Sequence, residues 1–245
     1  MHAFLLTLLI FIAALLYSSV GHGGASGYLA AMALFDLKPE VMKPTALVLN
    51  LFVASIGTMR FARAGCFSWS IFWPFAVLSV PFAFQGGRWT LPAHIYKIIL
   101  GLVLLFAAWR LAIKQTSTPA QKPVVVPLAL AFGGVIGLLS GLTGVGGGIF
   151  LSPLLLLLGW ADIRKTAGIS AAFILVNSAA GLLGLISRGR GLGTLAPEIL
   201  WWVPAVLIGG LLGAELGSRK LTPLIMRRLL AAVLVVAGLK MLLTK

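Results

Sequence analysis

The residues best suited to chemistry in this sequence form two glycine-rich stretches that also carry hydroxyl side chains. The first reads Gly21-His22-Gly23-Gly24-Ala25-Ser26-Gly27-Tyr28, and the second runs from Ser140 to Pro153 with Gly144, Gly146, Gly147 and Gly148 at its centre. Glycine costs about 1 kcal/mol against alanine inside a helix and reaches positive φ easily. We therefore expect both stretches to open a helix and leave backbone N–H and C=O groups without intrahelical partners.

Such openings are suited to binding anions. Freed N–H groups can face a negative ligand, and a helix that begins just beyond the opening adds partial positive charge. The hydroxyls of Ser26, Tyr28 and Thr143 either donate to the same ligand or satisfy the freed backbone groups. The alternative is that the glycines only allow close helix packing, but four glycines in five positions exceed what packing requires. The expected substrate-binding glycines are Gly21, Gly23, Gly24, Gly144, Gly146, Gly147 and Gly148.

Two ionisable residues are candidates for carrying a coupling proton. His22 lies inside the first glycine stretch, where it could bind the anion or titrate near neutral pH. The equally weighted alternative is a neutral histidine bonded to a freed carbonyl. Glu215 is the acid expected to lie deepest in an apolar segment, where a carboxylate is a candidate functional group. An ion pair between Glu215 and Arg219, one turn further on, is the slightly preferred alternative.

Polar residues inside otherwise apolar segments are a second set of candidates. Asn50, Ser170 and Asn177 each lie in the middle of such a segment. Hydrogen bonds between helices are the commonest role of such residues, and lining the solute pathway is the alternative. Lys43 and Lys165 stand near the start of corresponding segments, either as interfacial anchors or as groups that attract an anion.

Motifs for catalysis or metal binding are missing from the sequence. It has no nucleophile elbow, no His-Glu metal spacing and no P-loop lysine. Cys66 is the only cysteine, so neither an intrachain disulfide nor a cysteine-based metal site is expected. We therefore expect no catalytic residues, no metal, no cofactor and no enzymatic activity.

The composition is that of a membrane protein. Of the 245 residues, 60% are hydrophobic and 10% charged, against about 25% charged in soluble domains. The net charge of +14 comes from Lys and Arg at the ends of apolar runs. There they anchor helices and meet anionic lipid, a pattern unlike the basic face of a nucleic-acid-binding module. The expected partners are membrane lipid and a small anionic solute, with no nucleic acid; a homo-oligomer is compatible with the sequence.

The apolar runs predict helices on both sides of one polar, proline-bearing linker. The linker covers residues 114–127 and separates an N-terminal transmembrane repeat, 1–113, from a C-terminal one, 128–245. Short apolar pieces at 29–35 and 154–158 follow the glycine stretches. The expected longer helices are 3–20, 44–62, 69–86, 94–113, 128–139, 167–187, 199–217 and 224–243.

The two halves share one plan. Gly21-x-Gly23-Gly24 recurs 123 positions later as Gly144-x-Gly146-Gly147, and Lys43 corresponds to Lys165. The expected fold is an all-α polytopic membrane protein made of two homologous repeats of about four transmembrane helices each, with glycine-broken or re-entrant helices. We favour inverted over parallel repeats. Interrupted segments at matching positions of two repeats are typical of transporters with a site at the repeat interface.

The second stretch carries a family resemblance. Ser140-Gly141-Leu142-Thr143-Gly144-Val145-Gly146-Gly147-Gly148, followed by Leu151-Ser152-Pro153, resembles the signature of the TauE/SafE family of sulfite exporters. The duplicated layout and the length are also similar to that family. The resemblance implies a multi-pass protein of the bacterial inner membrane that moves small sulfur-containing anions such as sulfite, sulfoacetate or another organosulfonate, usually outward.

The expected function is therefore secondary transport of such an anion. The solute would be held near the membrane midplane between the two openings while one repeat moves against the other. With no ATP-binding motif in the sequence, a gradient of solute or protons would supply the energy. The alternatives are transport of another small anion, or a channel or scaffold role unrelated to sulfur compounds.

Overall fold

The computed structural model describes the backbone of residues 2–112, 122–189, 192–219 and 224–243. Across these ranges every regular element is a helix. The N-terminal half contains α1 (His2–Ser18), α2 (Ala25–Leu34), α3 (Pro39–Arg63), α4 (Trp69–Arg88) and α5 (Ala93–Ala112). The C-terminal half contains α6 (Val126–Thr143), α7 (Gly148–Leu157), α8 (Ile163–Ile186), the short 3-10 helix η1 (Leu192–Thr194), α9 (Ile199–Arg219) and α10 (Leu224–Leu243).

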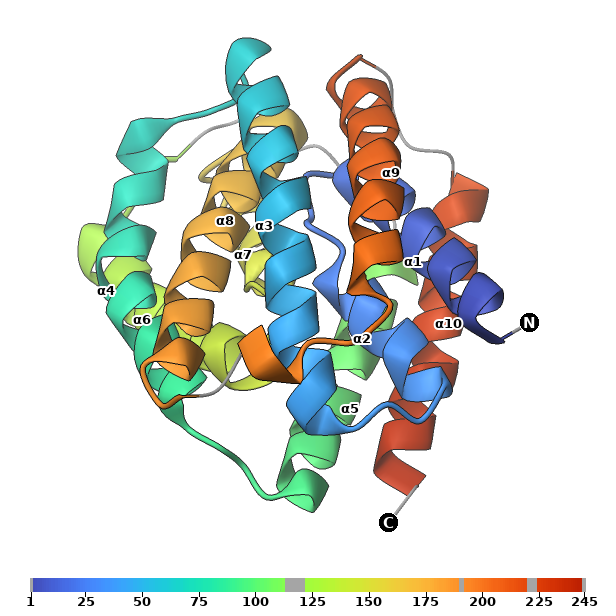
Figure 1. Cartoon of the computed structure of the whole chain (residues 1–245). Helices are drawn as coiled ribbons and strands as arrows, with labels where there is room; N and C mark the ends of the chain where they lie inside the picture. Colours follow the sequence, from blue (N-terminus) through green and yellow to red (C-terminus); the bar gives the residue numbers. More distant parts are fainter. Residues whose placement is uncertain (1, 113–121, 190–191, 220–223, 244–245) are drawn as a thin grey trace.

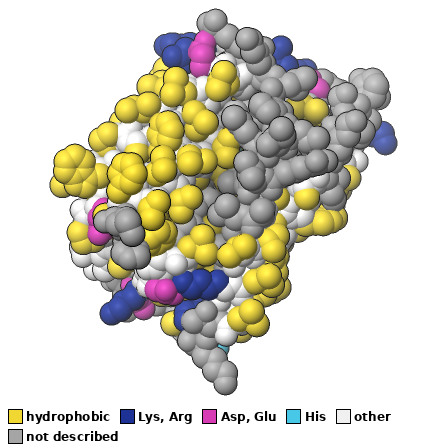
Figure 2. Space-filling view, turned by 90° about the vertical axis from the view of Figure 1, so that its right-hand side faces the viewer, with side chains coloured by type: hydrophobic (Ala, Val, Ile, Leu, Met, Phe, Trp, Pro, Cys, Tyr) yellow, Lys and Arg dark blue, Asp and Glu magenta, His cyan; other side chains and the backbone are white. Residues whose placement is uncertain are grey.

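Helix length and surface character both confirm a multi-pass membrane protein. Within the described ranges, four helices are long and apolar enough to cross a membrane: α3, α6, α8 and the 199–217 part of α9. Figure 2 shows hydrophobic side chains over much of one face, with Lys and Arg toward its upper and lower ends. Apolar side chains facing lipid between basic ends are typical of membrane-embedded helices.

The helices differ from the predicted ranges mainly around the glycine stretches. α6 continues to Thr143 and α7 begins at Gly148, so only residues 144–147 lie outside a helix there. Similarly, α1 ends at Ser18 and α2 begins at Ala25. The predicted openings were too wide because glycine weakens a helix without forbidding it. α6 also begins inside the predicted linker, since the first turn of a helix tolerates Pro127.

The helices of the two halves are packed against one another (Figure 1). α1 packs on α9, α4 on α6 and α8, and α5 on α10, while α3 contacts α8 and α9. α3 and α8 run antiparallel where they cross, as their contacts show: Gly57 faces Ala171, and Leu47 faces Gly181. This antiparallel crossing joins the two halves at the centre of the molecule.

Two large hydrophobic clusters form most of the core, and a small one joins Phe61, Cys66 and Ala167. One large cluster is built mainly from α1, α2, α3, α5, α9 and α10, with Tyr17, Tyr28 and Met42 among its buried side chains. The other is built from α4, α6, α7 and α8 and includes Phe75 and Phe173. Close packing of these side chains fixes the positions of the glycine openings between them.

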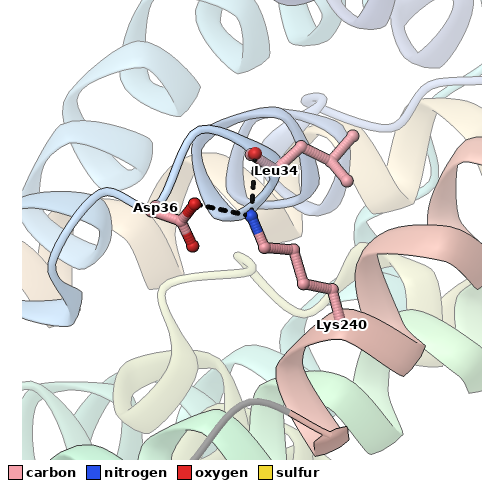
Figure 3. A network of polar contacts seen from close by, with 3 residues as sticks. All are labelled: Leu34, Asp36 and Lys240. Carbon is pink, nitrogen blue, oxygen red and sulfur yellow. Dashed lines mark hydrogen bonds and ion pairs between the residues drawn. The ribbon is translucent and has the colours of Figure 1, made fainter.

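α10 also contacts the C-terminal end of α2 (Figure 3). The Nζ of Lys240 donates to the carbonyl oxygen of Leu34 at 2.9 Å and pairs with a carboxylate oxygen of Asp36 at 2.9 Å. A cation at a helix C-terminus stabilises the last carbonyls. The short α2 is thereby connected to α10.

Small residues bring α6 close to α4. A Cβ on Gly137 would overlap the carbonyl oxygen of Ser79, so no side chain fits there without moving the backbone. Gly134 lies on the same helix, but a Cβ there would meet no atom nearer than 3.7 Å. The two glycines therefore differ in the space around them, although both lie inside one helix.

We expect Gly137→Ala to lower the melting temperature, whereas Gly134→Ala should leave it unchanged or raise it. Both changes improve helix propensity by about 1 kcal/mol, but only the first forces two backbones apart, and overpacking costs about 1–3 kcal/mol. Thermal unfolding of the purified variants in detergent measures the difference. Equal melting temperatures for the two variants would contradict close α4–α6 packing.

Candidate functional site

Each glycine stretch contains residues in the left-handed region of φ. In the first, Gly21 has φ +75° and Gly24 has φ +103°; in the second, Gly144, Gly146 and Gly147 have φ between +82° and +83°. L-amino acids with a side chain rarely adopt such angles. Gly24 and Gly147 are the N-cap residues of α2 and α7, and neither helix has a side-chain cap.

The two stretches meet at Asn50. A Cβ on Gly23 would lie 2.6 Å from Asn50 Oδ1, and a Cβ on Gly146 would lie 2.7 Å from Asn50 Nδ2. Ile174 of α8 borders both glycines at the same point. Gly23 and Gly146 immediately precede the two N-caps, so the N-terminal ends of α2 and α7 both lie beside the Asn50 amide. The structure thus brings together two openings more than a hundred residues apart.

The Asn50 amide bridges α3 and α8. It is fully buried, and its Nδ2 donates to Ser178 Oγ at 3.2 Å. Its Oδ1 is buried and receives no hydrogen bond from the described residues. Rotating the amide would let Oδ1 accept from the Ser178 hydroxyl and turn the Nδ2 donors toward the opening. Asn50 can therefore present either an acceptor or a donor to a ligand between the two stretches.

The other predicted polar residues of α8 contact neighbouring helices. Asn177 accepts from Ser79 Oγ at 2.6 Å and donates to the Phe173 carbonyl at 2.9 Å. The hydroxyl of Ser170 lies 2.8 Å from that of Ser152 on α7. Both residues thus make hydrogen bonds within and between helices, as one of the two interpretations of the sequence proposed.

The predicted hydroxyls of the glycine stretches are buried, and two of them hydrogen-bond to nearby backbone groups. Tyr28 donates to the Gly23 carbonyl at 2.9 Å. Thr143 Oγ1 donates to the Leu139 carbonyl at 2.7 Å and accepts from the Val145 N–H at 3.4 Å. Ser26 is buried in the first turn of α2. Gly148 also begins a helix, and Ile174 fills the space beside it.

His22 lies against the ring of Tyr17, with ring centroids 6.3 Å apart and an edge-on angle of 73°. It lines a narrow hollow with Gly21, Gly23 and Gly57 that has no room for a water-sized sphere. The hollow beside His22 therefore holds no solute in this conformation, although the His22 side chain is itself only half-buried.

Glu215 lies at a helix end and is joined to α3. Its carboxylate pairs with Arg60 at 3.0 Å, and the two side chains are 35% and 42% exposed. The sequence had favoured Arg219 as the partner, but that side chain lies outside the described residues. The Arg60–Glu215 pair joins the C-terminal ends of α3 and α9.

A cavity of about 400 Å³ lies at the opposite end of α3. Its lining includes Lys43, Trp89, Tyr96 and Leu142, and a Cβ on neighbouring Gly144 would lie 3.3 Å from Lys43 Cγ. The cavity therefore extends toward the second glycine stretch from one end of the molecule. We call it the inner cavity.

Lys43 does more than anchor a helix at the membrane interface. Its side chain is buried, and Nζ donates to the carbonyls of Gly86, Gly87 and Trp89 at 3.2, 3.3 and 3.4 Å. These carbonyls belong to the C-terminal end of α4, where helical carbonyls have no intrahelical partner. Nothing in the local sequence indicates that this helix end contacts a lysine 43 residues earlier.

Among the side chains that the structure describes, no three His, Cys, Asp or Glu residues lie close enough together to hold a metal ion.

Comparisons with known proteins agree with this architecture. The family model described as "Sulfite exporter TauE/SafE" matches residues 6–241. A probable membrane transporter protein of Sinorhizobium fredii is 42% identical over 242 residues, covering 97% of each chain. A probable membrane transporter protein of Methanocaldococcus jannaschii is 28% identical over 262 residues, covering 98% of this chain and 95% of its own. No solved structure matches the chain. The chain therefore belongs to the TauE/SafE sulfite exporter family of membrane transporters.

Proposed function

We propose that this protein is a secondary transporter of small sulfur-containing anions, such as sulfite, sulfoacetate or another organosulfonate, in the outward direction across the cell membrane. The observation that carries the proposal is the convergence of Gly23 and Gly146 on the buried Asn50 amide. Two uncapped helix N-termini beside one amide provide partial positive charge and hydrogen-bond donors without a buried arginine. Such a site can bind an anion and still release it.

The proposed site lies between two inverted repeats. Their order of elements is the same, since α1 to α5 and α6 to α10 each contain a glycine opening after the first helix. α3 and α8 would be equivalent helices under this scheme, and their antiparallel crossing agrees with inversion (Figure 1). Interrupted helices at the interface of inverted repeats hold the solute in many secondary transporters.

Alternating access is supported by the difference between the two ends of α3. The inner cavity opens beside Lys43 at one end, whereas the Arg60–Glu215 pair joins α3 to α9 at the other. The hollow that His22 lines has no room for a water-sized sphere. We infer that this conformation admits solute from the end that carries the inner cavity.

Flux assays in proteoliposomes test the proposed function. Purified protein should give saturable uptake of sulfite or sulfoacetate, stimulated by a pH gradient. Flux that rises linearly with concentration would indicate a channel. No flux for any small sulfur anion would remove the substrate assignment, and measurable flux of another small anion would support the alternative substrate class.

We further infer that His22, and not Glu215, carries the coupling proton. His22 lines the hollow at the first opening, while Glu215 is paired with Arg60 at a helix end. His22→Ala should abolish stimulation of flux by the pH gradient, whereas Glu215→Gln should retain it. The exposed Arg60–Glu215 pair contributes about 0–1 kcal/mol to stability, so the Glu215→Gln variant should remain folded. Stimulation that survives His22→Ala and disappears in Glu215→Gln would reverse the assignment.

A further inference from the structure

A second cavity lies next to the inner cavity, and we call it the outer chamber. It has a volume of about 390 Å³ and is lined by Arg88, Trp89, Thr90 and Arg188. Trp89 and Thr90 also line the inner cavity, so the two spaces adjoin. A single water needs only about 10–15 Å³ by this measure, and the outer chamber therefore has room for a small hydrated solute.

The outer chamber is formed where α4 and α8 end together. A Cβ on Gly184 of α8 would lie 3.0 Å from the Arg88 backbone nitrogen, which shows how closely the two helix ends approach. Arg88 is the last residue of α4, and Arg188 follows the end of α8. Two guanidinium groups from different halves of the sequence are thus placed around one space.

The charge of the outer chamber is positive and unbalanced. Its described lining contains two arginines and no acidic residue. The Nε of Arg88 is buried and finds no hydrogen-bond acceptor among the described groups, while its guanidinium carbon lies 5.8 Å from the centroid of the Phe84 ring. A buried charged donor without an acceptor is costly, so the Arg88 guanidinium would be stabilised by an anion held in the chamber that it lines.

The inner cavity is less suited to selecting anions. Lys43 lines it, but its ammonium group donates to three carbonyls of the α4 end. Glu40 also lines the inner cavity and opposes the entry of negative charge. The outer chamber is therefore better suited than the inner cavity to selecting a solute by its negative charge.

We propose that the outer chamber is an oxyanion-binding site, with Arg88 and Arg188 holding the sulfonate or sulfite group of a solute before it enters the inner cavity. This proposal rests on the transport function proposed above. Guanidinium groups bind planar pairs of oxygens on such anions by charge-assisted hydrogen bonds. The same chemistry would also hold the phosphate of a lipid headgroup, and the experiment separates the two sources.

The test compares wild type with the Arg88→Gln/Arg188→Gln double variant. Binding of methanesulfonate to the protein in detergent is measured by calorimetry, with neutral dimethyl sulfone as the uncharged analogue. We expect the double variant to bind methanesulfonate about tenfold more weakly and to show a similarly raised KM for sulfite flux at unchanged maximal flux. Dimethyl sulfone should show no measurable binding to either protein.

Two controls keep the result interpretable. Arg63→Gln removes an exposed arginine that lines neither cavity, and it should leave both quantities unchanged. Arg188→Gln alone changes an exposed residue and should weaken binding in a protein that folds normally. Native mass spectrometry with added phosphatidylglycerol shows whether wild type holds a lipid that the double variant loses.

The outcomes separate this inference from the proposed function. Normal sulfite flux with unchanged KM and unchanged methanesulfonate binding in the double variant would overturn the proposed binding role of the outer chamber. The transport proposal would still stand. Lost phosphatidylglycerol with unchanged methanesulfonate binding would also overturn the proposed binding role, because the ligand would then be a lipid. Methanesulfonate binding that depends on the arginines in a protein without sulfur-anion flux would support the chamber while the transport proposal fails. Neither binding nor flux in wild type would overturn both.

Discussion

Gly146→Ala is expected to lose at least about 90% of sulfur-anion flux while the protein remains folded. A Cβ at this position would lie 2.7 Å from Asn50 Nδ2 and 2.8 Å from Ile174 Cγ2. The amide end of Asn50 can swing away, so the clash displaces Asn50 from between the two glycine stretches more readily than it unfolds the protein. A tenfold loss corresponds to about 1.4 kcal/mol of lost solute stabilisation, comparable with one hydrogen bond to a charged group. Flux in proteoliposomes at equal protein content measures the effect.

Gly65→Ala is the matched control for this prediction. Gly65 has φ +70°, close to the +83° of Gly146, but a Cβ there would meet no atom within 4 Å. Both variants therefore carry the cost of a side chain at positive φ, about 1–2 kcal/mol, and only Gly146→Ala disturbs Asn50. Equal flux in the two variants would show that the contact with Asn50 has no effect beyond strain at positive φ. Asn50 would then not belong to the site.

Lys43→Met is expected to lower the free energy of unfolding by about 1–3 kcal/mol. Methionine keeps the length of the side chain but leaves the carbonyls of Gly86, Gly87 and Trp89 without the ammonium donor that they contact at 3.2–3.4 Å. The inner cavity borders Trp89, so water can partly replace the lost bonds, which keeps the expected cost below that of three unsatisfied buried groups. Thermal unfolding in detergent measures the change.

Lys38→Met serves as its control because Lys38 is exposed and precedes the first turn of α3. Both changes remove one positive charge near the same end of α3, but the control should leave the melting temperature unchanged. An unchanged melting temperature in Lys43→Met would support the other interpretation, in which Lys43 attracts the anion. If Lys43 mainly attracts the anion, Lys43→Met would raise the KM for sulfite and leave the melting temperature at the wild-type value.

The class of protein and the approximate positions of the two openings follow from local properties of the sequence. Hydropathy and charge are properties of a local stretch, so long apolar runs with basic ends already predict helices in a membrane. Positive φ is also a local preference, and the glycines of both stretches adopt it at Gly21, Gly24, Gly144, Gly146 and Gly147. The widths of the openings were misjudged, because each glycine adds a small cost that neighbouring residues can outweigh. The helices α3, α6 and α8 also begin earlier than predicted.

Contacts between residues far apart in the sequence depend on the packing of the whole chain. That Asn50 lies between Gly23 and Gly146, and that Lys43 reaches the end of α4, depends on how the helices are rotated and aligned against one another. The same holds for Glu215, which pairs with Arg60 on another helix. A single amphipathic or apolar segment does not specify the rotation and alignment of its neighbours, since many packings bury similar apolar area. Contacts across helices therefore emerge only when the whole chain is packed.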